Sequence, residues 1–171
     1  MNLYLMRHGD ATGVGGIITR DAERTLSERG AREVDAMARL LADTDPSIGL
    51  VLTSPLLRSV QTGEVMSKHL PMKPAVRSTD RLSPGFRPEE LLEELLTARC
   101  ESLVAVGHQP DMSGFISYVI SKSDASVEMQ PCSVAYIELT PHSAHRNARL
   151  RWLISPKLQQ AQERAFVRGL S

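Results

Sequence analysis

The sequence has no excess of either charge. Its 20 lysine and arginine residues balance 20 aspartate and glutamate residues, so the formal net charge is +0 at pH 7. Proteins that bind nucleic acid or an anionic membrane through a broad surface usually carry a net positive charge. The balance argues against both kinds of partner, and any basic cluster must be local.

Cysteine is also scarce. Cys100 and Cys132 are the only two, and they lie far apart and outside any C-x-x-C spacing. Two cysteines are too few for a disulfide framework, and a zinc site built on cysteine usually has C-x-x-C pairs, so we expect two reduced core thiols. His142 and His145 resemble half of a metal site, but they lack a third ligand and lie in a turn-rich segment, so we expect a solvated loop and no metal.

Long apolar runs are missing as well. The apolar segment 1–6 meets Arg7 and His8 too early to be the apolar region of a signal peptide, and no later run is long enough to span a bilayer. No repeat, low-complexity tract or linker divides the 171 residues, a length typical of one domain. We therefore expect a single cytoplasmic domain, 1–171, in which 157–171 form a C-terminal helix or a tail.

Short apolar runs and helix signals alternate along the chain. The runs at 3–6, 50–52 and 103–106 predict buried strands. Helices are predicted at 27–45, 54–69, 89–99 and 112–121, further strands at 73–77, 134–139 and 150–154, and a loop at 10–24. This alternation predicts an α/β protein, a three-layer α/β/α sandwich with a mainly parallel central sheet that the final hairpin makes mixed.

Three candidate site residues follow the predicted strands. His8 and His108 come directly after strands, and Arg58 lies in the first turn of a helix that Ser54 is predicted to cap. In a parallel sheet such positions meet at the carboxyl edge, where ligands of open α/β folds bind. The helix N-terminus adds a partial positive charge. With Arg7, two histidines and two arginines converge without a matching run of acids, which predicts a phosphate pocket.

Four sequence segments, in order, carry a resemblance to a known family. They are Leu5-Met6-Arg7-His8-Gly9, Leu26-Ser27 with Gly30, Ser54-Pro55-Leu56 with Arg58 and Thr62, and Val106-Gly107-His108. Together they resemble the motifs of the histidine phosphatase superfamily, whose members include phosphoglycerate mutases and acid phosphatases. The resemblance implies a phosphoglycerate mutase-like fold. Within the superfamily, the sequence most resembles the compact SixA-type phosphohistidine phosphatases. The segments that carry this resemblance are Met6-Arg7-His8-Gly9-Asp10-Ala11, Ser54-Pro55, Gly107-His108-Gln109-Pro110 and Ser155-Pro156.

The resemblance also implies roles for the site residues. His8 would attack phosphorus and form a phosphohistidine intermediate. Arg7, Arg58 and His108 would bind the nonbridging oxygens. Gln109 is a further candidate for the pocket wall. A neutral imidazole attacks without a separate base if an acceptor, such as a backbone carbonyl, holds its other nitrogen. Guanidinium and imidazolium donors stabilise the charge on the equatorial oxygens, so neither a metal nor a cofactor is expected.

The leaving group decides which substrate is expected. A phosphate ester needs its leaving oxygen protonated, and Asp80 is the nearest candidate acid. Glu89 and Glu90 can equally be ordinary first-turn acids of a helix. A phosphorylated imidazole carries its own ring proton at neutral pH. The segment 73–89 is also short where larger relatives insert a covering subdomain. We therefore expect a phosphohistidine on a signalling or phosphotransfer protein as the substrate.

Two alternatives stay open at this point. A phosphatase of small phosphomonoesters would belong to the same superfamily but would need the acid. A noncatalytic module would bind phosphorylated partners through the same crevice, although an intact His8 argues against it. A mutase is disfavoured, because it has to retain its intermediate in a more enclosed pocket.

Overall fold

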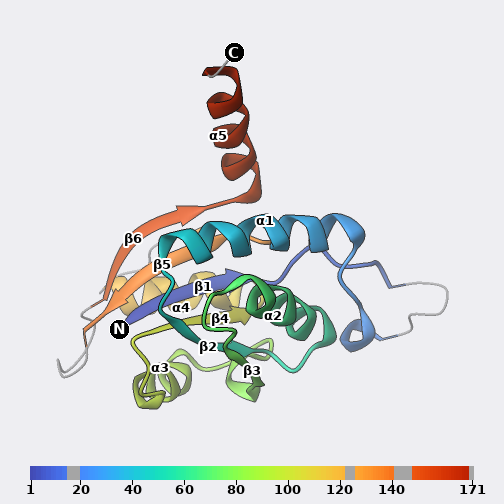
Figure 1. Ribbon diagram of the computed structural model, residues 1–171. Coiled ribbons are helices and arrows are strands. Elements are labelled where there is room, and N and C mark those ends of the chain that lie inside the picture. Colours follow the sequence, from blue (N-terminus) through green and yellow to red (C-terminus); the bar gives the residue numbers. More distant parts are fainter. Residues whose placement is uncertain (15–19, 122–125, 141–147, 170–171) are drawn as a thin grey trace.

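A mixed six-stranded sheet forms the centre of the protein (Figure 1). The computed structural model describes residues 1–14, 20–121, 126–140 and 148–169. The strands are β1 (Asn2–Arg7), β2 (Ile48–Thr53), β3 (Ala75–Ser78), β4 (Ser102–Gly107), β5 (Val134–Leu139) and β6 (Ala148–Ile154). Their order is β3-β2-β4-β1-β5-β6, and only the pairs β1–β5 and β5–β6 are antiparallel. The predicted sheet, mainly parallel with a final hairpin, is confirmed.

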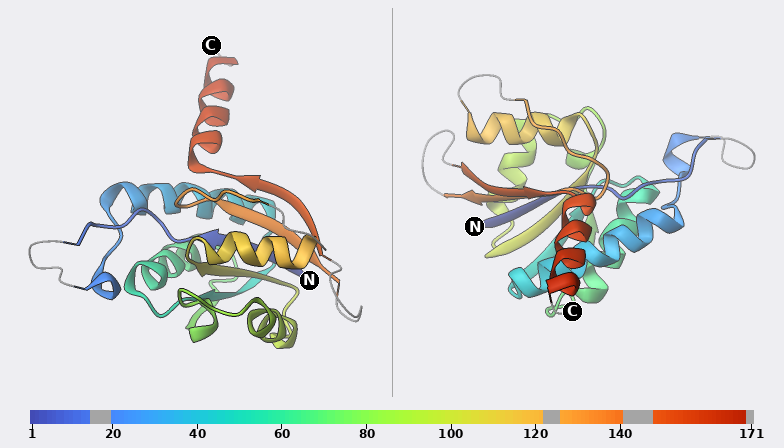
Figure 2. Two further views of the ribbon diagram at one scale, coloured as in Figure 1. Left: turned by 180° about the vertical axis from the view of Figure 1, so that it is seen from behind. Right: turned by 90° about the horizontal axis from the view of Figure 1, so that it is seen from above.

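Helices cover both faces of this sheet. They are α1 (Glu28–Thr44), α2 (Leu57–His69), α3 (Pro88–Thr97), α4 (Asp111–Ile120) and α5 (Pro156–Gly169), with short 3₁₀ turns η1 (Asp21–Glu23) and η2 (Asp80–Leu82). Figure 2 shows α1 and α2 on one face and α3 and α4 on the other, while α5 points away from the sheet. The three-layer sandwich is therefore confirmed. Among the described residues, no helix combines the length and hydropathy needed to cross a bilayer.

Successive residues of β1 face opposite layers of the sandwich. Leu3 and Leu5 belong to the core beneath α3 and α4, whereas Tyr4 and Met6 belong to the core beneath α1 and α2. All four are buried, which is why the apolar run of this strand is continuous rather than alternating. Since β1 lies between β4 and β5, its carboxyl end brings His8 to the middle of the sheet edge.

The two helices of the first layer begin differently. Ser27 caps α1, because its Oγ accepts the N–H of Gly30 at 3.0 Å. The prediction that Ser54 caps α2 is wrong. The backbone N–H of Ser54 still donates to the carbonyl of Val106 at 2.9 Å, so the residue continues the pairing of β2 with β4. Its Oγ accepts the N–H of Leu56 at 3.3 Å in the turn that precedes the helix.

The segment 10–24 is not a simple loop. Its described parts include η1 and an isolated bridge between Ala11 and Leu26, and η1 lies beside α2. The sequence prediction of a loop missed this turn because 10–24 has no helical or strand periodicity. The turn brings charged side chains to the carboxyl edge of the sheet.

Candidate active site

The carboxyl ends of β1 and β4 bring the two predicted histidines together. Arg7 pairs with Gly107 at the ends of these strands, and the N–H of His8 donates to the carbonyl of Gly107 at 3.0 Å. The rings of His8 and His108 have centroids 5.0 Å apart. Arg58, in the first turn of α2, contacts both rings. The four residues that the sequence predicts at one edge of the sheet therefore lie at its carboxyl edge. They are Arg7, His8, Arg58 and His108.

His8 is held between a donor and an acceptor. Nε of Arg58 donates a hydrogen bond to Nε2 of His8 at 3.1 Å. Because a guanidinium only donates, Nε2 must carry a lone pair, and the ring proton lies on Nδ1. Nδ1 donates to the carbonyl of Gly9 at 2.7 Å. The backbone acceptor expected from the sequence is therefore present, and the lone pair of the ring lies on Nε2.

His108 has the opposite tautomer. Nη2 of Arg58 lies 3.4 Å from Nδ1 of His108, which must accept for the same reason. The proton then lies on Nε2, which donates to the hydroxyl of Ser59 at 3.4 Å. Both His108 and Ser59 are buried, so these contacts fix the ring from two sides.

Both rings are neutral in the ligand-free protein. Burial lowers the pKa of His8 to about 4, with the charges of Arg58 and Arg7 lowering it further against the bond to Gly9. Burial, helped by the proximity of His8 and Arg58, lowers the pKa of His108 to about 3. An imidazolium donor is expected from the sequence, but burial beside arginines makes His108 neutral in the ligand-free protein. At pH 7 the positive charge of the cluster resides on arginines.

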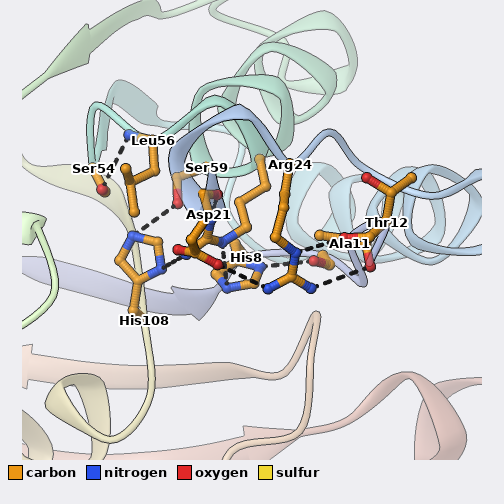
Figure 3. Close-up of polar contacts among 11 residues, drawn as sticks. His8, Ala11, Thr12, Asp21, Arg24, Ser54, Leu56, Ser59 and His108 are labelled. Atoms are coloured by element: carbon orange, nitrogen blue, oxygen red, sulfur yellow. Dashed lines mark hydrogen bonds and ion pairs between the residues drawn. The ribbon is translucent and has the colours of Figure 1, made fainter. Parts of the chain in front are cut away.

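An acidic residue that the sequence analysis missed holds Arg58. Nη2 of Arg58 pairs with Oδ2 of Asp21 at 2.9 Å, and Nη1 donates to the backbone carbonyl of Asp21 at 2.8 Å. Arg24 shares this carboxylate, since its Nη1 lies 3.1 Å from Oδ1 (Figure 3). The hydrogen bond from Arg24, and then that from Arg58, keep the pKa of Asp21 below its usual value. The oppositely charged pair at i,i+3 was the available sequence signal.

Thr62 joins the two segments that carry His8 and Arg58. Its buried Oγ1 accepts the N–H of Gly9 at 3.1 Å and donates to the carbonyl of Arg58 at 2.7 Å. The peptide after His8 is therefore tied to the first turn of α2 through one hydroxyl. The carbonyl of that same glycine holds the His8 proton.

Arg7 reaches the cluster from the end of β1. Its Nη1 donates to the carbonyl of Met129 at 2.8 Å, while its buried Nε has no hydrogen-bond partner among the described residues. Burial lowers the pKa of Arg7, and the guanidinium stays charged because its ordinary pKa is far above 7. The Nε–H of Arg7 is thus a buried charged donor whose hydrogen bond is not supplied by the described residues.

Gln109 and Asp80 lie outside these contacts. The amide of Gln109 bonds with Ser113 in the first turn of α4, with Nε2 donating to Oγ at 2.6 Å and Oε1 accepting the N–H at 3.1 Å. Asp80 is exposed in η2, and no hydrogen bond or ion pair joins it to the cluster among the described residues. It follows the edge strand β3, and η2 itself lies against β4.

No group of three histidine, cysteine, aspartate or glutamate side chains in residues 1–14, 20–121, 126–140 and 148–169 is arranged to hold a metal ion. His142 and His145 fall outside these ranges.

Comparison with known proteins agrees with this geometry. Residues 3–83 match the model of the histidine phosphatase superfamily (branch 1). An uncharacterised protein of a Picosynechococcus species is 34% identical over 115 residues, which cover 66% of this chain and 68% of that protein. The phosphohistidine phosphatase SixA of Escherichia coli is 26% identical over 160 residues, covering 91% of this chain and 94% of SixA.

The chain belongs to the histidine phosphatase superfamily. A solved structure of SixA in complex with tungstate has a TM-score of 0.80 to this histidine phosphatase, with 24% identity, and covers 92% of this chain and 98% of that one. The phosphoglycerate mutase-like fold is thereby confirmed. This SixA-like phosphatase carries Arg7, His8 and Arg58 within the segment matched to the family, whereas His108 lies beyond it and joins the site through β4.

Proposed function

We propose that this histidine phosphatase hydrolyses phosphate from a phosphorylated histidine on a signalling or phosphotransfer protein, through a phosphohistidine intermediate on His8. The observation that supports the proposal is the set of protonation states of the side chains in the cluster. The cluster contains an unprotonated nucleophilic nitrogen and arginine cations, but its one carboxyl group in the described chain, that of Asp21, is ionised between two arginines. An ester needs a proton donor at this point, and a phosphorylated imidazole does not.

The first step moves the phosphoryl group between two imidazoles. The lone pair on Nε2 of His8 forms a bond to phosphorus as the P–N bond of the substrate breaks. The substrate ring leaves as neutral histidine, because its other nitrogen already carries a proton. The ring of phosphorylated His8 is then positively charged, and its Nδ1–H keeps the short hydrogen bond to the carbonyl of Gly9.

The second step releases inorganic phosphate. A water oxygen attacks phosphorus, and the electrons of the P–N bond return to Nε2 of His8. The water protons are shared between the phosphate product and the solvent. Arg7 and Arg58 stabilise the charge on the equatorial oxygens in both steps, and His108 donates to them once a bound dianion has raised its pKa.

The substrate, the compartment and the extent of the domain belong to the same proposal. A protein phosphohistidine as substrate implies a role in cytoplasmic signal transduction, with the whole chain, 1–171, acting as one domain. The SixA name of a relative that is 26% identical supports this substrate class. Tungstate in the SixA structure is an oxyanion of the shape that a phosphate pocket accepts.

The test is phosphate release from a phosphohistidine-bearing transfer domain, measured beside a small aryl phosphate ester. We expect release from the protein substrate, a loss of at least about 10³-fold in His8→Ala, and an acid-labile phosphoryl label on His8 in the wild-type protein alone. His69→Ala is the matched control, because His69 lies at the other end of α2 and contacts Asp35 instead of the cluster.

Each other outcome has a defined meaning. A strong preference for the ester would make the protein a small-molecule phosphatase, and Asp80→Asn would then be the first acid variant to measure. Binding of the phosphorylated domain without release or labelling would indicate a noncatalytic module. Full activity of a folded His8→Ala variant would exclude His8 as the nucleophile.

A further inference from the structure

Arg58 is a buried cation with one carboxylate partner in the described part of the chain. Its side chain is only 5% exposed, and the partner is Asp21. A buried guanidinium without a counter-ion is costly, because water no longer solvates its charge. In the absence of substrate, Asp21 is therefore what neutralises the arginine that the proposed function assigns to the phosphoryl group.

The contact has the form of an oxyanion bound to a guanidinium. Two oxygens of Asp21, one from the carboxylate and one from the backbone carbonyl, accept from Nη2 and Nη1 of Arg58 at 2.9 and 2.8 Å. Phosphates bind guanidinium groups through this same pair of N–H donors. The remaining edge of the guanidinium faces Nε2 of His8, where phosphorus would be attached. Asp21 thus occupies donors that a phosphoryl group next to His8 needs.

A second partner is already in place for the carboxylate. Asp21 is 56% exposed, and Arg24 pairs with it at 3.1 Å from the solvent side. Arg24 is held independently, because it also donates to the backbone carbonyls of Ala11 and Thr12 (Figure 3). The carboxylate can leave Arg58 and keep both its hydration and its pairing with Arg24. The free-energy cost of replacing this carboxylate at Arg58 by another anion is therefore small.

We propose that Asp21 is an internal anion that competes with phosphate for Arg58, and so sets the affinity of the pocket for its product. The inference rests on the proposed function of the cluster. An incoming phosphoryl group displaces the Asp21 carboxylate towards Arg24, and the carboxylate returns as inorganic phosphate departs. The returning carboxylate weakens the binding of inorganic phosphate. It does not release the phosphoryl group while that group is covalently bound to His8.

The experiment measures direct binding of inorganic phosphate by titration calorimetry to the wild-type protein, Asp21→Asn and Asp35→Asn. Asparagine keeps the shape of the side chain and removes its charge. We expect Asp21→Asn to bind phosphate about tenfold more tightly, the effect of removing one charged competitor. Asp35→Asn is the matched control, because Asp35 is also shared between two basic side chains, Arg39 and His69, far from the cluster.

The proposal fails if Asp21→Asn binds phosphate as weakly as the wild-type protein, or more weakly. Weaker binding would mean that Asp21 holds Arg58 in position for the phosphate. Asp21→Ala provides a second variant, with thermal unfolding to establish that each protein is folded. Turnover is measured separately, so tighter phosphate binding without phosphohistidine hydrolysis would support the competition while contradicting the proposed function.

Discussion

At the scale of single residues, one hydroxyl has a large effect on the nucleophile. Thr62 holds the N–H of Gly9, and the carbonyl of Gly9 holds the proton of His8. The tautomer of His8 therefore depends on a residue that does not touch it. Arg58 contributes from the other side, because its Nε–H can only donate a hydrogen bond and so requires the lone pair on Nε2 of His8.

Replacement of Thr62 tests this link. In Thr62→Val the shape is kept, but the N–H of Gly9 is left without its partner, and we expect kcat to fall by about 10- to 100-fold with a loss of about 1–2 kcal/mol in unfolding free energy. Thr62→Ser keeps the hydroxyl and should retain most of the activity. The nitrogen NMR shifts of His8 report its tautomer directly. A single tautomer in a slow Thr62→Val variant would contradict the explanation.

The histidine pKa values predict how stability depends on pH. Unfolded, His8 and His108 titrate near 6.5, whereas folded they titrate near about 4 and about 3. Between these limits the unfolded chain binds more protons, so stability falls as pH decreases from about 6.5 towards 4. Asp21, whose folded pKa is lowered, loses its contribution only below its ordinary value of 3.8.

Thermal unfolding at a series of pH values measures this dependence. We expect the melting temperature of the wild-type protein to fall between pH 6.5 and 4, and to fall less steeply in His8→Ala, which lacks one of the two depressed groups. The control is His69→Ala, which should keep the wild-type slope. Equal slopes in all three proteins would show that His8 is not buried in its neutral form.

At the scale of elements, the site depends on how closely α1 approaches the segment after His8. A Cβ atom at Gly30, in the first turn of α1, would lie 2.1 Å from the backbone oxygen of Asp10 and 2.8 Å from its nitrogen. Backbone atoms cannot yield as a flexible side chain can, so the helix or the segment must shift. Close packing of this helix thus holds the residues that follow the nucleophile.

Gly30→Ala should therefore reduce both stability and activity. We expect a loss of about 2 kcal/mol or more in urea unfolding, and a lower kcat from displacement of Gly9 and Asp10. Gly114→Ala is the matched control, since a Cβ there, on an exposed part of α4, meets nothing within 4 Å. That variant should be more stable by about 0.5–1 kcal/mol, because alanine favours the helix. An unchanged Gly30→Ala would refute the packing argument.

Local sequence patterns predict most of the helices and strands. They do not predict how elements far apart in the chain are placed relative to one another. The continuous apolar run before Arg7 is sufficient to predict β1, because burial on both faces requires it. Asp21 was missed, because its position depends on how η1 rests on α2, and 10–24 has no periodicity to indicate this. The Ser54 cap was wrongly predicted, because a serine before proline looks the same whether it starts a helix or extends a strand.

At the scale of the whole molecule, strand order decides which predicted residues meet. The sequence indicates that β2, β3 and β4 are strands but not that β3 lies at the edge, beyond β2. Asp80 follows this edge strand in η2, which packs against β4, and yet no hydrogen bond or ion pair joins its side chain to the histidines among the described residues. His108 and His8, a hundred residues apart in the chain, meet because β4 and β1 are neighbours.

The reversed direction of β5 adds a backbone contact at the sheet edge that holds His8. Because β5 is antiparallel to β1, it is the beginning of this strand that reaches the edge holding His8, and the segment before it supplies the carbonyl of Met129 to Arg7. The four expected site residues come from the ends of parallel strands and from α2, whereas this contact comes from the segment before β5. Because a backbone carbonyl makes the contact, it does not depend on the identity of the side chain at that position. The exposed side chains of this segment, Ser126, Glu128 and Gln130, can therefore vary while Arg7 keeps its partner.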